Sequence, residues 1–167
     1  FHLGLLADYT LSEKISLSAG LQYSTKGARY KGEVPYYDQE VGGLATLVVT
    51  YRKRLAYIDV PILANYRLSD QFDFLLGIQP SILLSAKIKN DENAQKAFNL
   101  PKKEDAKDNY KTFDFAILIG PKYRINDKFF VQLLYNHGLL KIAHEESYDY
   151  YAGTEDKDFK VMNRVLK

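Results

Sequence analysis

A short, polar, turn-forming motif recurs three times in this chain at a constant spacing. The copies begin at Tyr9, Tyr66 and Tyr123, so each tyrosine follows the previous one by 57 residues. Each copy lies between two segments in which apolar and polar residues alternate, a pattern typical of a tight β-hairpin. The sequence therefore predicts three antiparallel hairpins in series and an all-β fold.

The alternation is clearest after the second turn. Even-numbered residues from Phe72 to Ala86 are apolar, whereas polar or small residues dominate the odd-numbered positions from Asp73 to Lys87. A period of two places the apolar side chains on one face of a strand. On this pattern we predict seven strands, at residues 1–10, 15–28, 55–67, 72–88, 112–124, 129–142 and 159–167.

The connections between these strands alternate in length. Outer-membrane β-barrels have short periplasmic turns and long extracellular loops. No apolar stretch reaches the roughly 18 residues that a spanning helix needs, whereas a transmembrane strand needs only about 9–11. The sequence therefore predicts an antiparallel up-and-down β-barrel in a bacterial outer membrane. Its periplasmic turns would be 11–14, 68–71 and 125–128, and its extracellular loops 25–54, 89–111 and 143–158.

A water-soluble barrel would show the same alternation, with its apolar face inward. However, the polar positions at mid-strand are mostly glycine, serine, alanine and glutamine, which suit a narrow lumen better than a water-exposed surface. We therefore favour the membrane barrel, with aromatic girdles at both membrane interfaces. Girdle candidates are Tyr9, Tyr66 and Tyr123 at the short-turn end, and Tyr23, Tyr57, Phe113 and Tyr135 at the opposite end.

The number of strands bears on how the barrel closes. Single-chain barrels of bacterial outer membranes have an even number of strands. The first predicted strand runs toward a short turn, so we expect one further strand before Phe1 and eight strands in total. Residues 1–167 would then be one barrel domain, truncated at both ends.

Several segments resemble the PorT-like outer-membrane β-barrel family of Bacteroidota. These are residues 19–28, 57–63 and 76–81, while Tyr135-Asn136-His137-Gly138-Leu139 resembles the penultimate strand of that family. The resemblance covers essentially the whole chain, and residues 57–63 are its best marker. It implies a small eight-stranded barrel and, for some members, a part in type IX secretion.

Composition narrows the chemistry. The absence of cysteine excludes disulfides, thiolate metal sites and cysteine nucleophiles. A formal net charge of +2 with intermixed acids and bases gives no basis for nucleic-acid binding. The acidic segment 144–158 does not have the spacing of a calcium-binding loop, so we interpret it as a solvated loop. We expect no cofactor and no metal site.

His137 is the sharpest enzymatic candidate. It shares a strand face with Tyr135 near one strand end, and with Ser85 it would make the histidine and serine of a lipid-modifying acyl hydrolase. No local motif supports this pair, and a histidine at the membrane interface is the favoured interpretation. His2 and His144 have no partner at catalytic or metal-ligand spacing.

Two sets of charged residues have predicted roles. Cations at the outer rim would bind phosphates of lipopolysaccharide through charge-assisted hydrogen bonds; they are Lys26, Arg29, Lys31, Arg52, Lys53 and Arg54. Charges in the lumen phase would have to be paired, forming a salt-bridged plug; they are Asp59, Asp73, Lys87, Asp114, Lys122 and Arg124.

Three prolines lie within predicted strands. Because Pro61, Pro80 and Pro121 cannot donate a ladder hydrogen bond, we predict bulges or strand ends there.

The leading functional hypothesis is a non-enzymatic barrel that serves as an accessory or scaffold subunit of an outer-membrane assembly. Its partners would be membrane lipid, lipopolysaccharide and other outer-membrane proteins. A lipid-modifying enzyme using His137 and an adhesin or ligand-binding barrel acting through loops 25–54 and 89–111 are the alternatives.

Overall fold

The computed structural model describes residues 1–38, 42–126, 129–143, 162 and 164–166. Strands dominate the described part, and no helix in it is long and apolar enough to cross a membrane. The elements in chain order are β1 (His2–Thr10), β2 (Ile15–Asp38), β3 (Gly43–Asp59), β4 (Ile62–Arg67), β5 (Phe72–Asn90), α1 (Glu92–Phe98), β6 (Lys103–Asp105), the 3-10 helix η1 (Lys107–Asn109), β7 (Phe113–Arg124), β8 (Phe130–Gln132), β9 (Tyr135–Gly138) and β10 (Arg164–Leu166).

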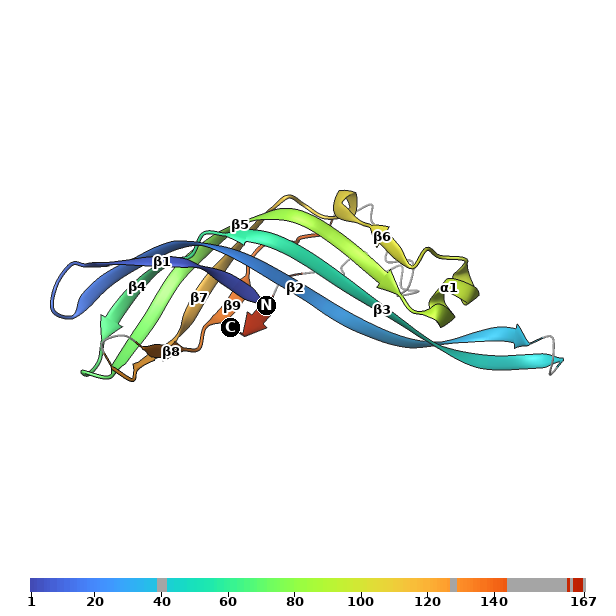
Figure 1. The fold of residues 1–167 in the computed structure, drawn as a ribbon, viewed down its shortest axis with the longest axis horizontal. Helices are drawn as coiled ribbons and strands as arrows, with labels where there is room; N and C mark the ends of the chain where they lie inside the picture. Colours follow the sequence, from blue (N-terminus) through green and yellow to red (C-terminus); the bar gives the residue numbers. More distant parts are fainter. Residues whose placement is uncertain (39–41, 127–128, 144–161, 163, 167) are drawn as a thin grey trace.

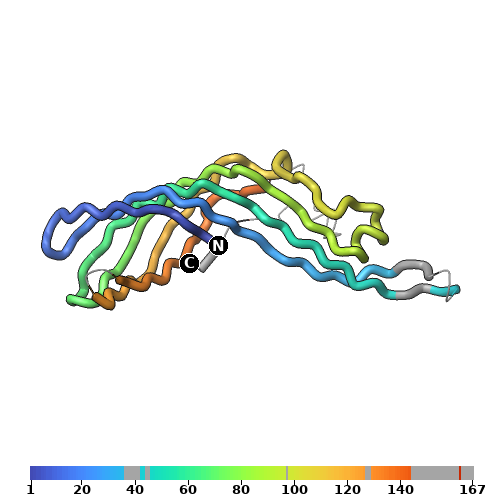
Figure 2. The backbone as a smooth tube through the Cα atoms, viewed as in Figure 1, coloured from blue at the N-terminus to red at the C-terminus, as the bar shows by residue number. Residues whose placement is uncertain are grey.

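The strands form one strongly curved antiparallel sheet (Figures 1 and 2). Its order is β1-β2-β3-β5-β7-β9-β10, with β4 pairing β2 and β5, and β8 pairing β7. Each strand on this path pairs with the next in an up-and-down arrangement, which confirms the predicted all-β architecture. Among the described residues β1 and β10 are the two ends of the path and do not pair with each other. The eighth strand stays a prediction.

The three short turns lie where the sequence predicts them. Leu11 N and Ser12 N both donate to Ile15 O, and Leu68 N and Ser69 N both donate to Phe72 O. In the third turn, Ile125 N donates to Phe129 O at 2.9 Å. Repeated sequence thus gives repeated backbone geometry.

The connection predicted at 25–54 is not an irregular loop. It is an antiparallel hairpin in which β2 and β3 remain paired from Gln22 and Asp59 to Asp38 and Gly43. A membrane crossing takes about 9–11 residues, whereas β2 alone has 24. The hairpin therefore continues far beyond the rest of the sheet, as Figure 2 shows.

The connection at 89–111 also has its own structure. Asp91 caps α1 by accepting a hydrogen bond from Ala94 N at 2.7 Å, and its other carboxylate oxygen accepts one from Thr50 N in β3 at 2.7 Å. Asn93 Nδ2 donates to Val48 O at 2.8 Å. Because both contacts reach β3, α1 is fastened to the base of the hairpin.

The outer surface of the sheet is apolar over a limited height. On β5, alternate side chains from Phe72 to Ile82 face outward and are exposed or, at Pro80, half-buried; the paired positions on β7 run from Tyr123 to Phe113. Ten residues of strand rise about 33 Å, or about 25 Å across a membrane at a tilt near 40°. That equals the height of the apolar band of outer-membrane barrels, about 25 Å.

One bulge changes the phase of β5. Ala56 pairs with Ser85 but the next residue, Tyr57, pairs with Leu83, so Leu84 is an extra residue. Before the bulge odd-numbered side chains face inward; beyond it Ala86 and Ile88 are buried and Lys87 is exposed. The predicted inward position of Lys87 is therefore wrong, because a one-residue bulge moves every following side chain to the other face.

The prolines coincide with interruptions of the ladder in two places. Pro61 separates β3 from β4, and Val60 N donates to Pro80 O at 2.9 Å, so Pro80 faces the same interruption. Pro121 lies opposite the break between β8 and β9, where Leu133 N donates to its carbonyl at 3.0 Å. The predicted strand end is confirmed at Pro61. At Pro80 and Pro121 the prediction is wrong, because β5 and β7 continue through them without a bulge and each missing donor faces a gap in the neighbouring strand.

Two inward-facing glycines let neighbouring strands approach closely. A Cβ added at Gly77 would collide with the backbone carbonyl of Ile62, and one added at Gly120 with the backbone carbonyl of Leu133. Only a residue without a side chain fits at either point.

Candidate functional site: the lumen and the outer rim

The lumen is filled by side chains that form apolar and polar layers. Toward the long hairpin it contains one apolar cluster, and toward the short turns a second, smaller one. The first consists of Tyr51, Leu55, Tyr57, Leu83, Ala86, Ile88, Ala106, Tyr110 and Ile142, and the second of Leu63, Leu75, Leu118 and Leu134.

A buried cation lies close to two carboxylates on β3 and β7, the two strands that flank β5. Lys26 Nζ is 3.4 Å from Asp114 Oδ2 and 3.9 Å from Asp59 Oδ1, and it lies 4.4 Å from the centre of the Tyr57 ring. The Lys26 side chain is 2% exposed, and both carboxylates are fully buried. Charges removed from water to this degree are tolerated only when they are paired, and this triad joins β2, β3 and β7 on the inner face of the sheet.

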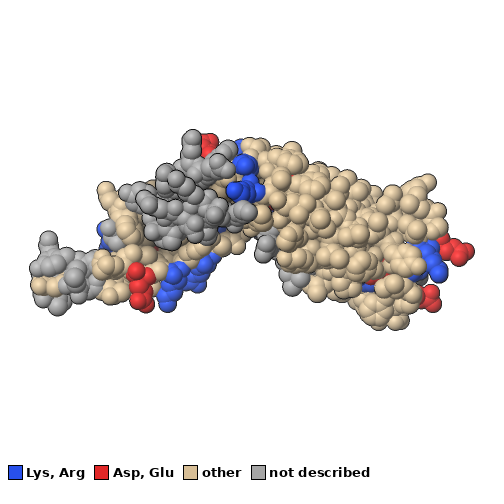
Figure 3. All heavy atoms as spheres, turned by 180° about the vertical axis from the view of Figure 1, so that it is seen from behind, with Lys and Arg blue, Asp and Glu red and all other residues tan. Residues whose placement is uncertain are grey.

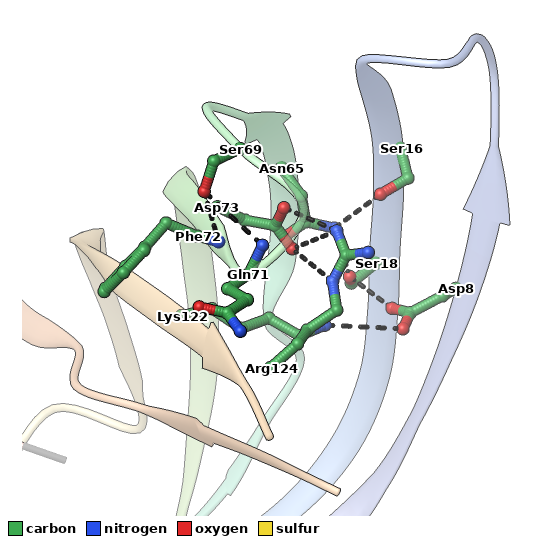
Figure 4. A network of polar contacts seen from close by, with 10 residues as sticks. All are labelled: Asp8, Ser16, Ser18, Asn65, Ser69, Gln71, Phe72, Asp73, Lys122 and Arg124. Carbon is green, nitrogen blue, oxygen red and sulfur yellow. Dashed lines mark hydrogen bonds and ion pairs between the residues drawn. The ribbon is translucent and has the colours of Figure 1, made fainter. Parts of the chain in front are cut away.

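A second polar network lies near the short turns (Figure 4). Arg124 forms a bidentate ion pair with Asp73: Nη2 donates to Oδ1 at 2.6 Å and Nε donates to Oδ2 at 3.2 Å. Lys122 Nζ lies 3.7 Å from Asp8 Oδ2, and Ser18 donates a hydrogen bond to Asp8. The network connects β1, β2, β5 and β7 at this end of the lumen.

Asn65 extends this network through β4. Its Nδ2 donates to Ser18 Oγ at 2.6 Å and to Ser16 Oγ at 3.2 Å. These hydrogen bonds add β4 to the four strands β1, β2, β5 and β7 that the network already connects.

A small cavity lies beside the second apolar cluster, with Leu63, Leu118 and Leu134 in its wall. It has a volume of about 40 Å³, enough for a few water molecules. Its wall includes the polar side chains of His2, Gln22, Gln79 and Gln132. A cavity of this size is too small for an organic ligand.

Six of the seven predicted girdle residues face outward. They are Tyr9, Tyr66, Tyr123, Tyr23, Phe113 and Tyr135, with exposures from 39% to 69%. Tyr135, however, pairs with Ile119 in the middle of β7, so it belongs to the apolar wall rather than to the outer girdle. Tyr57 is 0% exposed, which contradicts its assignment to the girdle. It shares its strand face with Asp59, two residues away, and both point into the lumen.

The predicted lumen charges divide in a similar way. Asp59, Asp73, Asp114, Lys122 and Arg124 all take part in lumen ion pairs, and Lys87 does not. Asp8 and Lys26 complete these pairs without having been predicted to do so. The even-numbered phase of β2, which Lys26 shares with Ser18 and Ser24, is the signal that identifies it as a lumen residue.

The predicted rim cations lie on two faces of the hairpin. Arg29, Lys31, Arg52 and Arg54 occupy its outer face, whereas Lys26 is in the lumen. Lys53 lies on the inner face, with Nζ 5.3 Å and 5.7 Å from the centres of the stacked Tyr30 and Tyr51 rings. The prediction that Lys26 and Lys53 lie at the outer rim is therefore wrong. Successive side chains of a strand point to opposite faces, and those of Lys26 and Lys53 point to the inner face.

The outer face holds further cations from β5 and β6. Across the sheet, Arg29 pairs with Arg52, Arg52 with Lys89, and Lys89 with Lys103. In the adjacent row Arg54 pairs with Lys87. We call this set the outer cationic patch; its members are Arg29, Lys31, Arg52, Arg54, Lys87, Lys89 and Lys103. In Figure 3 the broad wall of the sheet carries almost no charge, and Lys and Arg side chains gather where the hairpin leaves it.

The structure does not bring His137 and Ser85 together. His137 pairs with Ile117, which pairs with Ile78 on β5, and Ser85 lies seven residues further along that strand. His137 Nδ1 is instead 3.3 Å from the hydroxyl of Tyr135. The proposed catalytic pair is therefore wrong, because β7 and several residues of β5 lie between its members.

Other candidate residues are placed as follows. His2 lies on β1 and borders the small cavity. His144 and the acidic segment 144–158 lie outside the described residues. Within the described ranges, no group of three or more His, Asp or Glu residues is arranged to hold a metal ion.

Comparison with known protein families shows a match over most of the chain. Residues 1–144 match a family described as outer membrane protein beta-barrel domain. No curated protein and no solved structure shows significant similarity to the chain.

Proposed function

Because the chain belongs to the outer membrane protein beta-barrel domain family, we propose that it is a non-enzymatic barrel acting as an accessory or scaffold subunit of an outer-membrane assembly. The assembly that we propose is a secretion machine or a machine that inserts barrels into the outer membrane. The resemblance of residues 57–63 and 135–139 to PorT-like barrels of Bacteroidota supports the secretion machine.

The filled lumen is the observation that carries this proposal. Solute conduction needs a continuous aqueous path, and here two apolar clusters and two networks of paired charges lie in series along the lumen. Breaking a buried ion pair costs about 3–5 kcal/mol, so these layers do not open easily. A barrel of this kind is better suited to binding other proteins than to transport.

The β2–β3 hairpin supplies the surface for such binding. It extends about 15 residues beyond Tyr23, or about 50 Å at the rise of an extended strand. In the orientation that we propose, with short turns in the periplasm, this hairpin stands outside the cell. Its attachment to α1 through Asp91 and Asn93 holds its base in a fixed direction.

The experiment that tests the proposal is affinity purification of the tagged full chain from outer membranes in mild detergent, followed by mass spectrometry. The matched variant replaces residues 31–50 by Asn-Gly. A two-residue turn of this type suits a hairpin closed at the directly opposed pair Tyr30 and Tyr51. We expect stoichiometric outer-membrane partners with the wild-type chain and their loss with the shortened hairpin.

Folding of both proteins is checked by gel mobility before and after boiling. A wild-type chain that purifies as a lone, monodisperse barrel would count against a scaffold role. The alternative of an adhesin or ligand-binding barrel makes a different prediction. If that alternative holds, cells that carry the variant with the shortened hairpin would lose adhesion, and the membrane proteins that co-purify with the chain would be unchanged.

A further inference from the structure

The outer cationic patch is arranged in a way that costs stability when nothing is bound to it. Like charges directly opposite each other on neighbouring strands are destabilising. Arg29, Arg52, Lys89 and Lys103 form one continuous row of four cations across β2, β3, β5 and β6. Arg54 and Lys87 add a directly opposed pair in the next row. An anion lying on these rows would remove the repulsion.

The protein itself provides little neutralisation. Within the described part of the chain, none of the seven cations forms an ion pair. Asp105 is opposite Lys87, but its Oδ1 accepts a hydrogen bond from Lys107 N at 3.0 Å within its own loop. Glu33 lies at the far edge of the patch, opposite Val48. The lumen cations show the opposite behaviour, since Lys26, Lys122 and Arg124 are each paired.

The patch begins just beyond the apolar wall. The outermost apolar row joins Tyr23, Ile58 and Ile82. Arg54 precedes Ile58 by four residues, which is about 13 Å along the strand and about 10 Å along the membrane normal at the usual tilt. The head-group layer reaches about 5–8 Å beyond the hydrocarbon, so the row of Arg54 and Lys87 lies at its outer edge. The row of Arg52 and Lys89, two residues further along the strands, lies about 5 Å beyond that edge. All seven cations occupy outward-facing positions, so their side chains point away from the lumen.

We propose that the outer cationic patch binds the phosphorylated head group of an outer-leaflet glycolipid. Four strands at a spacing of about 4.8 Å make the long row about 14 Å wide, and the two rows are about 7 Å apart. An area of this size fits a head group with several phosphates, such as the lipid A part of lipopolysaccharide, better than a phospholipid with one. Arginine forks bind phosphate oxygens bidentately, and lysines add point charges.

This inference uses the membrane orientation of the proposed function, but its test does not depend on a protein partner. The full chain is purified in detergent and titrated with bisphosphorylated lipid A, with the same lipid after dephosphorylation, and with phosphatidylglycerol. Bound lipid is counted by native mass spectrometry. The test variant is Arg52→Gln/Lys89→Gln, which removes the centre of the long row. The control variant is Lys14→Gln/Arg67→Gln, which removes the same charge at the short-turn end.

We expect wild-type and control proteins to bind bisphosphorylated lipid A equally, and the test variant to bind it at least about tenfold more weakly, since contacts to a charged group are each worth about that factor. Dephosphorylated lipid A should bind weakly to all three proteins. Equal binding of phosphorylated and dephosphorylated lipid, or an unchanged affinity of the test variant, would overturn the site. Equal binding of phosphatidylglycerol would overturn the assignment to a glycolipid. Loss of co-purifying proteins in the affinity purification has no bearing on these outcomes.

Discussion

At the scale of single residues, burial decides which charges hold the molecule together. Lys26 is paired with two carboxylates and removed from solvent, whereas Arg29, three residues later, lies on the outer face. Surface charges of the second kind contribute little to folding. The same residue class therefore has a structural role in the lumen and, in our proposal, a binding role at the rim.

Replacement of Lys26 by methionine tests the structural role. Lys26→Met leaves Asp59 and Asp114 buried without their cation, so we expect the free energy of unfolding to fall by about 3–5 kcal/mol. The measurement is urea unfolding in lipid vesicles, followed by the gel mobility of unboiled samples. Adding Asp114→Asn to the variant should recover part of the loss. Equal stability of Lys26→Met and wild type would show that the triad contributes nothing.

At the scale of secondary-structure elements, one extra residue determines which side chains of β5 face the lumen and which face outward. The bulge at Leu84 lets Phe72–Ile82 present an apolar outer wall, while Lys87 and Lys89 still reach the outer cationic patch. If β5 kept the same residues without the bulge, Lys87 would enter the apolar cluster beside Leu55, and Ile88 would leave it. The bulge thus allows the outer face of one strand to be apolar along the membrane wall and cationic beyond it.

Deletion of Leu84 tests this interpretation. Because Leu84 is the extra residue, its removal leaves Leu83 opposite Tyr57 and Ser85 opposite Ala56, and it restores regular alternation. Ile88 then still faces inward and Lys87 outward, so we expect the variant to refold into vesicles and to keep its heat-dependent mobility shift. Insertion of one alanine between Lys87 and Ile88 is the contrasting variant; it turns Ile88 outward and Lys89 inward, and we expect it to lose the shift. Failure of the deletion variant to refold would contradict the assignment of Leu84 as the extra residue.

At the scale of the whole molecule, the arrangement is asymmetric along the membrane normal. One end has three tight turns and a polar network, and the other has a hairpin, a helix and a band of cations. We infer that the hairpin end lies outside the cell. The chain has no cysteine, so single cysteines can report this orientation without a background signal.

Cysteines at Gly32 and Asp70 make the test. An added side chain at Gly32 meets nothing within 4 Å, and Asp70 is exposed in the second turn. A membrane-impermeant maleimide should label Gly32→Cys in intact cells, and Asp70→Cys only after the outer membrane is permeabilised. Labelling in the reverse order would invert the proposed orientation, and with it the leaflet to which the cationic patch is assigned.

The sequence by itself determined the architecture of this protein. Three turn motifs 57 residues apart and a strict period of two dictate antiparallel hairpins with one apolar face, because turn chemistry and side-chain alternation are local properties of the backbone. The lumen charges at Asp59, Asp73, Asp114, Lys122 and Arg124 followed from the same alternation.

Only the tertiary structure decided the rest. A bulge leaves no mark in the sequence around Leu84, so the reversal at Lys87 depended on how β3 and β5 pair. The pairing of Arg29, Arg52, Lys89 and Lys103 also arises from register between strands that are distant in the chain. Register is set by packing across the whole sheet, and for this reason the outer cationic patch could be recognised as one surface only once the strands were assembled.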